Sequence, residues 1–155
     1  MGKLLRLRKK KGQRGQAMVE FALVLPLLLI VTFIIIDFGF AFSQWVVITN
    51  ATREGARLGA TGKSADLVAT RTIDASNGTL AGAGDVVTVE YLDLNGDGVG
   101  IGDQVVVKAR HDYNLLTPLD SFLNLAGLNP ITLSACSDMR VEITVVGATG
   151  GGSSC

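Results

Sequence analysis

The sequence predicts an α+β protein in which a long N-terminal helix packs on a small, mostly antiparallel sheet. Residues 21–36 form an apolar run of 16 residues that contains no charge. Residues 86–92 and 104–111 are rich in the valines typical of strands, with the turn-forming DLNGDGVGIGD between them. Residues 131–146 alternate apolar and polar side chains. Helical and strand segments in separate parts of one short chain favour α+β.

The composition excludes several classes of protein. Of the 155 residues, 48% are hydrophobic and 18% are charged, which argues against a disordered chain. The 14 basic and 14 acidic residues are unevenly distributed, because seven basic and no acidic residues lie in the first 14 positions. The chain from Gly15 onward therefore carries 7 basic and 14 acidic residues, a net charge of −7. Such an acidic remainder would repel phosphates, so we expect no nucleic-acid partner.

The apolar run predicts a membrane-spanning helix. Residues 21–36 would span about 24 Å, which is less than the roughly 30 Å hydrocarbon core. Extension to Phe42 gives about 33 Å, provided that Asp37 lies near the interface or faces a partner. We therefore expect the transmembrane part at about residues 21–42. The basic block before it should remain cytoplasmic and the rest should be extracytoplasmic. A buried core helix of a soluble protein is the alternative.

The junction before the apolar run suggests a processing site. We find no A-x-A cleavage motif after the run, whereas Gly15 stands before it in RGQAMVEFALVLPLL. Cleavage after Gly15 would remove the basic leader, residues 1–15, and leave Gln16 as the new N-terminus. Glu20 would become the fifth mature residue, and a carboxylate at the edge of an apolar run is costly unless paired. The α-amine of a neighbouring copy could pair with it; alternatively, Glu20 lies among the lipid headgroups near a helix start.

This junction resembles the class III signal of type IV pilins and pseudopilins. More specifically, residues 15–60 resemble the TadE-like family of Tad/Flp pilus assembly. The resemblance is strongest over residues 16–26, at the Asp37-Phe38-Gly39 step and over residues 50–60. Residues 105–111 and 139–142 are similar to the family's C-terminal strands. Phe40 departs from the pattern, because many relatives have a basic residue there.

The resemblance implies a pseudopilin-like fold and a function in pilus assembly. A prepilin peptidase would cut after Gly15, and the mature protein would be anchored in the inner membrane. Its partners would be the lipid bilayer, other pilin or pseudopilin subunits and the inner-membrane pilus assembly platform. Helix-to-helix packing would incorporate it into an extracellular pilus, with Glu20 setting the register against Gln16 of an adjacent subunit.

Beyond the leader, residues 16–60 are predicted to form one long helix. Pro26 removes a backbone hydrogen bond within it and should kink or loosen it. Arg53, Glu54 and Arg57 lie on one face, and Ala51, Gly55 and Gly59 form a strip of small residues on an adjacent face. This region is either a subunit-contact surface or a solvated helix face.

The head is expected at residues 61–146. Residues 64–76 can form a short amphipathic helix that Asn77-Gly78 ends, and residues 119–125 a helical turn. Sixteen residues are long for one strand, so the alternating segment 131–146 should contain a bulge or turn near residues 136–138. Residues 147–155 form a Gly/Ser-rich tail that ends in Cys155.

The loop between the two valine-rich strands resembles half of a calcium-binding loop. Asp93, Asn95 and Asp97 precede Gly98 in the D-x-N-x-D-G pattern. The glutamate expected at the twelfth position is absent; Gln104 stands there, preceded by Asp103. Weak Ca²⁺ binding and a plain polar hairpin loop are both compatible with this pattern, and no other cofactor is indicated.

Cys136 and Cys155 are the only cysteines. In an extracytoplasmic head they can form a disulfide, and the flexible tail could bring Cys155 back to the sheet. Closing this loop would contribute about 3 kcal/mol. Two free thiols or an intermolecular bridge are the alternatives.

No catalytic constellation is evident, so we expect no enzymatic activity. His111 is the only histidine, which excludes histidine clusters, and it is interpreted with Asp112 as a solvated pair. The sequence contains no P-loop, no G-x-S-x-G and no G-x-G-x-x-G after a strand. A membrane-tethered binding module, stabilised by calcium and without a pilus function, is the alternative to pilus assembly.

Overall fold

A computed structural model describes residues 13–125, 127, 131–145 and 150–155 of the chain. Most of the expected leader, residues 1–12, the last residue of the expected head, Val146, and the start of the expected tail, residues 147–149, lie outside the described residues. The elements follow in the order α1 (Gln13–Ala60), α2 (Ala65–Ala75), β1 (Val86–Leu92), β2 (Gln104–Tyr113), α3 (Leu119–Leu125) and β3 (Ile131–Arg140). A long helix on a small sheet is the α+β arrangement that the sequence predicts.

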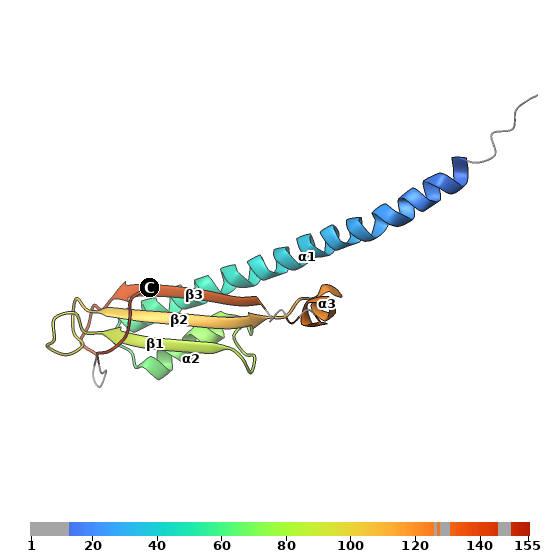
Figure 1. The fold of residues 1–155 in the computed structure, drawn as a ribbon. Coiled ribbons are helices and arrows are strands. Elements are labelled where there is room, and N and C mark those ends of the chain that lie inside the picture. The colour runs from blue at the N-terminus through green and yellow to red at the C-terminus, as the bar shows by residue number, and fades with distance from the viewer. Residues whose placement is uncertain (1–12, 126, 128–130, 146–149) are drawn as a thin grey trace, which may run out of the picture.

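The N-terminal helix α1 is much longer than the head. Its 48 residues span about 72 Å. Figure 1 shows that its C-terminal half lies along the sheet, whereas its N-terminal half extends away from the head. The helix continues through Pro26, whose missing N–H leaves the Ala22 carbonyl without its usual intrahelical partner.

The sheet contains three antiparallel strands in the order β1-β2-β3. Central β2 pairs with β1 from Val86↔Arg110 to Leu92↔Gln104 and with β3 from Gln104↔Arg140 to Tyr113↔Ile131. Pairing with β3 is continuous through Cys136, so the predicted bulge or turn near residues 136–138 is wrong. Strand β3 ends at Arg140. Beyond it, Val141 and Val145 are buried against the head core, whereas Ile143 is exposed, so the predicted alternation does not persist as alternating burial.

The core lies between the sheet, α1 and α2. Buried positions of α1 recur at helical spacing, with Ile48, Ala51, Ala56 and Ala60 facing the head. Val105 and Val107 of β2 are fully buried, and each such side chain contributes about 1.5–3 kcal/mol. The small residues of α1 therefore face the head of the same chain, where the valines of the central strand require a close approach.

A disulfide fixes the C-terminal tail to the sheet. Cys136 of β3 is bonded to Cys155, with their Cα atoms 5.8 Å apart. The Gly151 N–H donates to the Tyr91 carbonyl, and Lys108 Nζ donates to Ser153 Oγ at 2.9 Å. The tail thus crosses the sheet face opposite to α1, and the closed loop stabilises the fold by about 3 kcal/mol in the chain-entropy description.

Candidate functional site

The N-terminal junction lies within α1. Gly15 is helical, and a Cβ added there would meet no atom within 4 Å, so packing does not require glycine at this position. Glycine in a helix interior costs roughly 0.5–1 kcal/mol relative to alanine. Gln16 is the next residue of the helix, and the Glu20 side chain is exposed. Within the described part of the chain, no group forms an ion pair or hydrogen bond with the Glu20 carboxylate.

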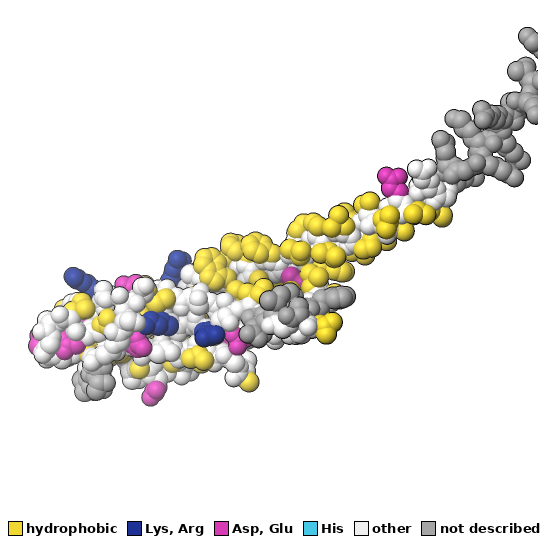
Figure 2. All heavy atoms as spheres, viewed as in Figure 1, with side chains coloured by type: hydrophobic (Ala, Val, Ile, Leu, Met, Phe, Trp, Pro, Cys, Tyr) yellow, Lys and Arg dark blue, Asp and Glu magenta, His cyan; other side chains and the backbone are white. Residues whose placement is uncertain are grey.

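An exposed apolar surface follows the junction along α1. Figure 2 shows apolar side chains along the visible face of the part of the helix that leaves the head. Among the described residues, the helix segment Gly15–Ala60 is the one candidate membrane span, with a mean hydropathy of 2.8 in a window of which no part is buried. Leu23, Leu27 and Ile35 each have about two thirds or more of their side-chain surface exposed. Such exposure would be costly in water and suits a bilayer.

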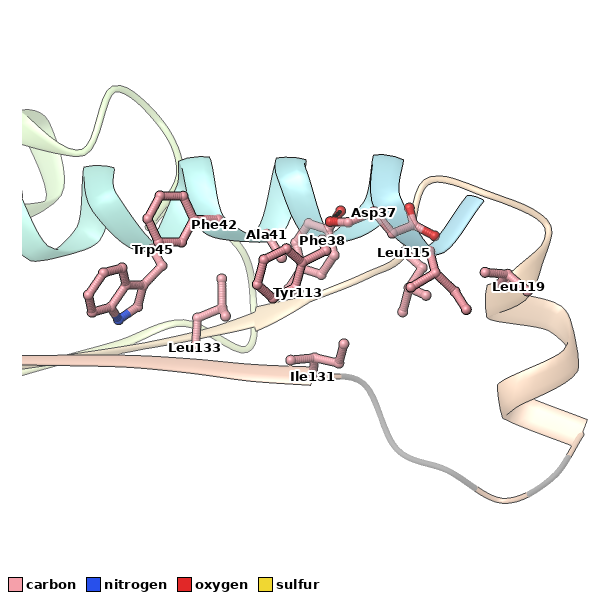
Figure 3. Close-up of a pocket in the computed structure, with 11 residues that line it drawn as sticks. Asp37, Phe38, Ala41, Phe42, Trp45, Tyr113, Leu115, Leu119, Ile131 and Leu133 are labelled. Atoms are coloured by element: carbon pink, nitrogen blue, oxygen red, sulfur yellow. Dashed lines mark hydrogen bonds between the residues drawn. The ribbon is translucent and has the colours of Figure 1, made fainter. Parts of the chain in front are cut away.

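Asp37 interrupts this apolar surface but is itself buried. Its Oδ1 accepts hydrogen bonds from the backbone N–H groups of Leu116 and Thr117 at 3.0 and 3.3 Å, and its Oδ2 accepts from the Thr117 hydroxyl. The Tyr113 hydroxyl donates to the Asp37 carbonyl oxygen. Figure 3 shows Asp37 on α1, with Tyr113 on one side of it and Leu115 on the other. The carboxylate therefore faces the turn before α3, within the same chain.

His111 takes part in a contact that the sequence did not reveal. Its Nδ1 lies 2.6 Å from Asp85 Oδ1, and its Nε2 lies 2.9 Å from Gln44 Oε1 of α1. The interpretation of His111 and Asp112 as a solvated pair is therefore wrong, because His111 is largely buried and Asp112 accepts a hydrogen bond from Thr132. Adjacent residues of a strand face opposite sides, and Asp85 lies 26 positions away in the sequence, so no local motif indicates this pairing.

The candidate subunit-contact residues divide between the surface and the interior of the head. Glu54 Oε1 lies 3.3 Å from both Arg57 and Arg71 of α2, and hydrogen bonds from these two arginines hold the pKa of Glu54 below its usual range. Arg53 and Arg57 remain exposed. The strip of small residues, in contrast, faces inward: a Cβ on Gly59 would lie 2.7 Å from Val105, and one on Gly55 would collide with Thr72. Close packing within the head accounts for these glycines.

The loop between β1 and β2 brings three aspartates together. Ligand atoms of Asp93, Asp97 and Asp103 all lie within 4.8 Å of one another. Both carboxylate oxygens of Asp93 accept backbone N–H groups, from Gly96 at 2.6 Å and Gly98 at 2.9 Å, and these bonds lower its pKa. Buried Asp103 likewise accepts from the N–H groups of Leu94 and Gly100, while Asn95 Oδ1 accepts from the Asp97 N–H. These side chains therefore brace the loop through hydrogen bonds of its own backbone.

The comparison with protein families supports an assignment for the N-terminal region. Residues 15–57 match the family model described as TadE-like protein. The comparisons with curated proteins and with solved structures gave no match. The matched segment begins at the candidate processing residue and includes Glu20, the apolar span and Asp37. The N-terminal helix is thus similar to TadE-like proteins over these 43 residues.

Proposed function

We propose that this protein is a pseudopilin that acts in assembly of the Tad pilus. In this proposal a prepilin peptidase removes residues 1–15, and the mature chain begins at Gln16 with its apolar helix retained. The helix first anchors the protein in the inner membrane and later packs against the helices of other pilus subunits. Its head requires no catalytic residues for this function.

The observation that carries the proposal is the N-terminal half of α1, which leaves the head with its apolar side chains exposed. Nothing in the described part of the chain covers residues 18–24, and Met18 and Leu23 are 76% and 75% exposed. A bilayer can cover this surface before assembly, and neighbouring helices can cover it afterwards. One apolar helix can therefore serve successively as anchor and as part of a filament core.

The junction residues fit this proposal. Gly15 is not required by packing, which favours a role in recognition by the peptidase. After cleavage the Gln16 α-amine would lie at the helix start, four residues before the exposed Glu20 carboxylate. An amine of one copy and a carboxylate of another, both at the edge of an apolar surface, would attract strongly where water is scarce. Such a pair would set the axial register of adjacent helices.

The proposed topology places the leader in the cytoplasm and the head outside it. The seven basic residues before Gly15 favour retention of that end on the cytoplasmic side. The disulfide between Cys136 and Cys155 suits the oxidising conditions of the extracytoplasmic space. The inner-membrane assembly platform and the other pilin subunits would then meet the protein at the bilayer.

Substitution of Glu20 tests the register. We expect Glu20→Ala to be processed and inserted normally but to reduce pilus assembly severely, because no carboxylate remains to pair with the new N-terminus. Glu20→Asp should retain part of the assembly, since it keeps the charge. Immunoblotting of the processed protein and electron microscopy of surface pili measure the two steps separately.

Glu142→Ala provides a matched control, because Glu142 is also exposed but lies on the head. We expect this variant to assemble pili as the wild type does. Wild-type numbers of pili from Glu20→Ala would eliminate Glu20 as the register residue.

A further inference from the structure

An apolar groove lies between α1 and the end of the head that faces the N-terminal half of the helix. It has a volume of about 620 Å³. Figure 3 shows Phe38, Phe42 and Trp45 on its α1 side, with Leu133 of β3 and Leu115 and Leu119 around α3 opposite them. Among the described residues that line it, Asp37 is the only charged one, and its carboxylate is already hydrogen-bonded to the turn before α3.

The position of α3 along α1 relates this end of the head to the proposed membrane span. The hydrogen bonds from Leu116 and Thr117 hold the turn before α3 at the level of Asp37. If the span begins after Glu20, Asp37 lies only about 24 Å along the helix from Phe21, within a hydrocarbon core of roughly 30 Å. Any tilt of the helix would place Asp37 deeper still. The turn and the residues beside it must then share that depth.

The scarcity of charged residues at this end of the head is compatible with a position at the depth of the membrane span. Residues 113–133 contain a single charged residue, Asp120, and residues 21–52 of α1 contain only Asp37. Asp120 accepts a hydrogen bond from Asn124 on α3, and the Asp37 carboxylate accepts donors from the head. Leu116 and Leu125 are 65% and 87% exposed. Outside these two segments the head carries charges on every element, so the charge-poor region is confined to one end.

We propose that α3 and the turn before it insert into the outer leaflet of the bilayer beside α1, and that lipid acyl chains fill the apolar groove. The head would then be held to the membrane at two points, the helix and this apolar end. The inference rests on the membrane anchorage in the proposed function. A second copy of α1 could also fill an apolar groove, but continuity with the membrane span and the shared depth favour lipid.

Tryptophan fluorescence can test this proposal, because Trp45 is the only tryptophan of the chain. In the full chain with Trp45→Phe, a reporter is introduced by Leu116→Trp, and in a second variant by Leu125→Trp. Each protein is reconstituted in phosphatidylcholine vesicles with either ordinary or brominated acyl chains. We expect both reporters to emit at blue-shifted wavelengths and to lose intensity in the brominated vesicles.

Two control variants in the same background make the outcomes distinguishable. Ile101→Trp places the reporter at an equally exposed apolar residue, 73% exposed, in the loop at the other end of the sheet, and it should not be quenched. Leu28→Trp places it within the apolar span and should be quenched strongly. Circular dichroism and the absence of free thiols check that each variant is folded.

If the tryptophan of Leu28→Trp is quenched but neither Leu116→Trp nor Leu125→Trp is, the insertion of α3 and its preceding turn is overturned while the anchorage stands. A blue shift at α3 that depends on protein concentration, without quenching by bromine, would identify a second copy as the occupant and would also overturn it. No quenching at Leu28→Trp would contradict both the anchorage and the inference.

Discussion

Aspartates of this chain are tolerated in unusual places because backbone N–H groups surround them. Asp37 stands within an apolar helix, yet it is 5% exposed and accepts hydrogen bonds from two backbone amides and a hydroxyl. Asp93 accepts backbone amides in an exposed loop. Hydrogen bonds to a carboxylate stabilise its charged form. The hydrogen-bond donors around each aspartate, rather than its position in the sequence, therefore explain why the fold tolerates it.

The loop between β1 and β2 should therefore be sensitive to acid. N–H bonds from Gly96 and Gly98 hold the pKa of Asp93 below its ordinary value of 3.8. Because the folded carboxyl has the lower pKa, its contribution to stability is complete above that ordinary value and is lost as the pH falls through the folded pKa. An NMR titration should show the amide resonances of Gly96 and Gly98 shifting with a midpoint below 3.8.

Asp93→Asn is the control for this titration, since it removes the titrating group and should abolish the transition. A midpoint at or above 3.8 in the wild-type protein would show that these hydrogen bonds do not stabilise the charged carboxylate.

The role of a residue can be predicted from the sequence more readily when its contacts are close in the sequence than when they are distant in it. The alternation of apolar and polar residues in the strands can be read directly from the sequence. The partners of Asp37 lie 79 and 80 residues away, and Gln44 lies 67 residues from His111. No local spacing indicates such pairs, so the contacts of Asp37 and His111 emerge only from the fold.

Among the elements, α1 serves two different environments. Its C-terminal half carries small residues because β2 and α2 approach closely, and its N-terminal half carries large apolar residues that the head does not cover. The sequence predicts both halves as one helix, because their apolar and small residues are all compatible with helical geometry. The sequence does not reveal that the small residues of α1 face the head. Close packing of a helix against its own chain and against another chain requires the same spacing of small residues.

The contact between α1 and the turn before α3 should depend on Asp37. We expect Asp37→Ala to leave the N–H groups of Leu116 and Thr117 and the Thr117 hydroxyl without an acceptor, at a cost of about 1–3 kcal/mol. Hydrogen exchange of the full chain in detergent should show faster exchange at residues 116 and 117, with little change in the sheet.

Asp120→Ala is the matched control, because Asp120 is the other acid of this region and accepts a hydrogen bond from the Asn124 side chain. It should leave the exchange of residues 116 and 117 unchanged. Equal exchange in Asp37→Ala and in the wild type would show that Asp37 does not hold this turn.

The whole molecule joins a disulfide-bonded head to a long apolar helix that extends away from it. Disulfide, sheet and helix packing hold the head together. In the proposed function, the apolar helix that leaves the head exchanges the bilayer for neighbouring pilus helices. The α+β architecture and the long helix could be predicted from hydropathy and alternation. The disulfide that ties the tail to the sheet is one of the alternatives that the two cysteines allow, and the structure contains it. The packing of α3 could not be predicted, because it depends on contacts between segments distant in sequence.

Mass spectrometry of the protein purified from native membranes tests most directly whether the apolar helix is retained after the basic leader is removed. We expect an intact mass and an N-terminal peptide that begin at Gln16 and include the complete apolar span. A protein that still begins at Met1, or one that has lost residues 21–42, would contradict the proposed processing and the use of this helix in assembly.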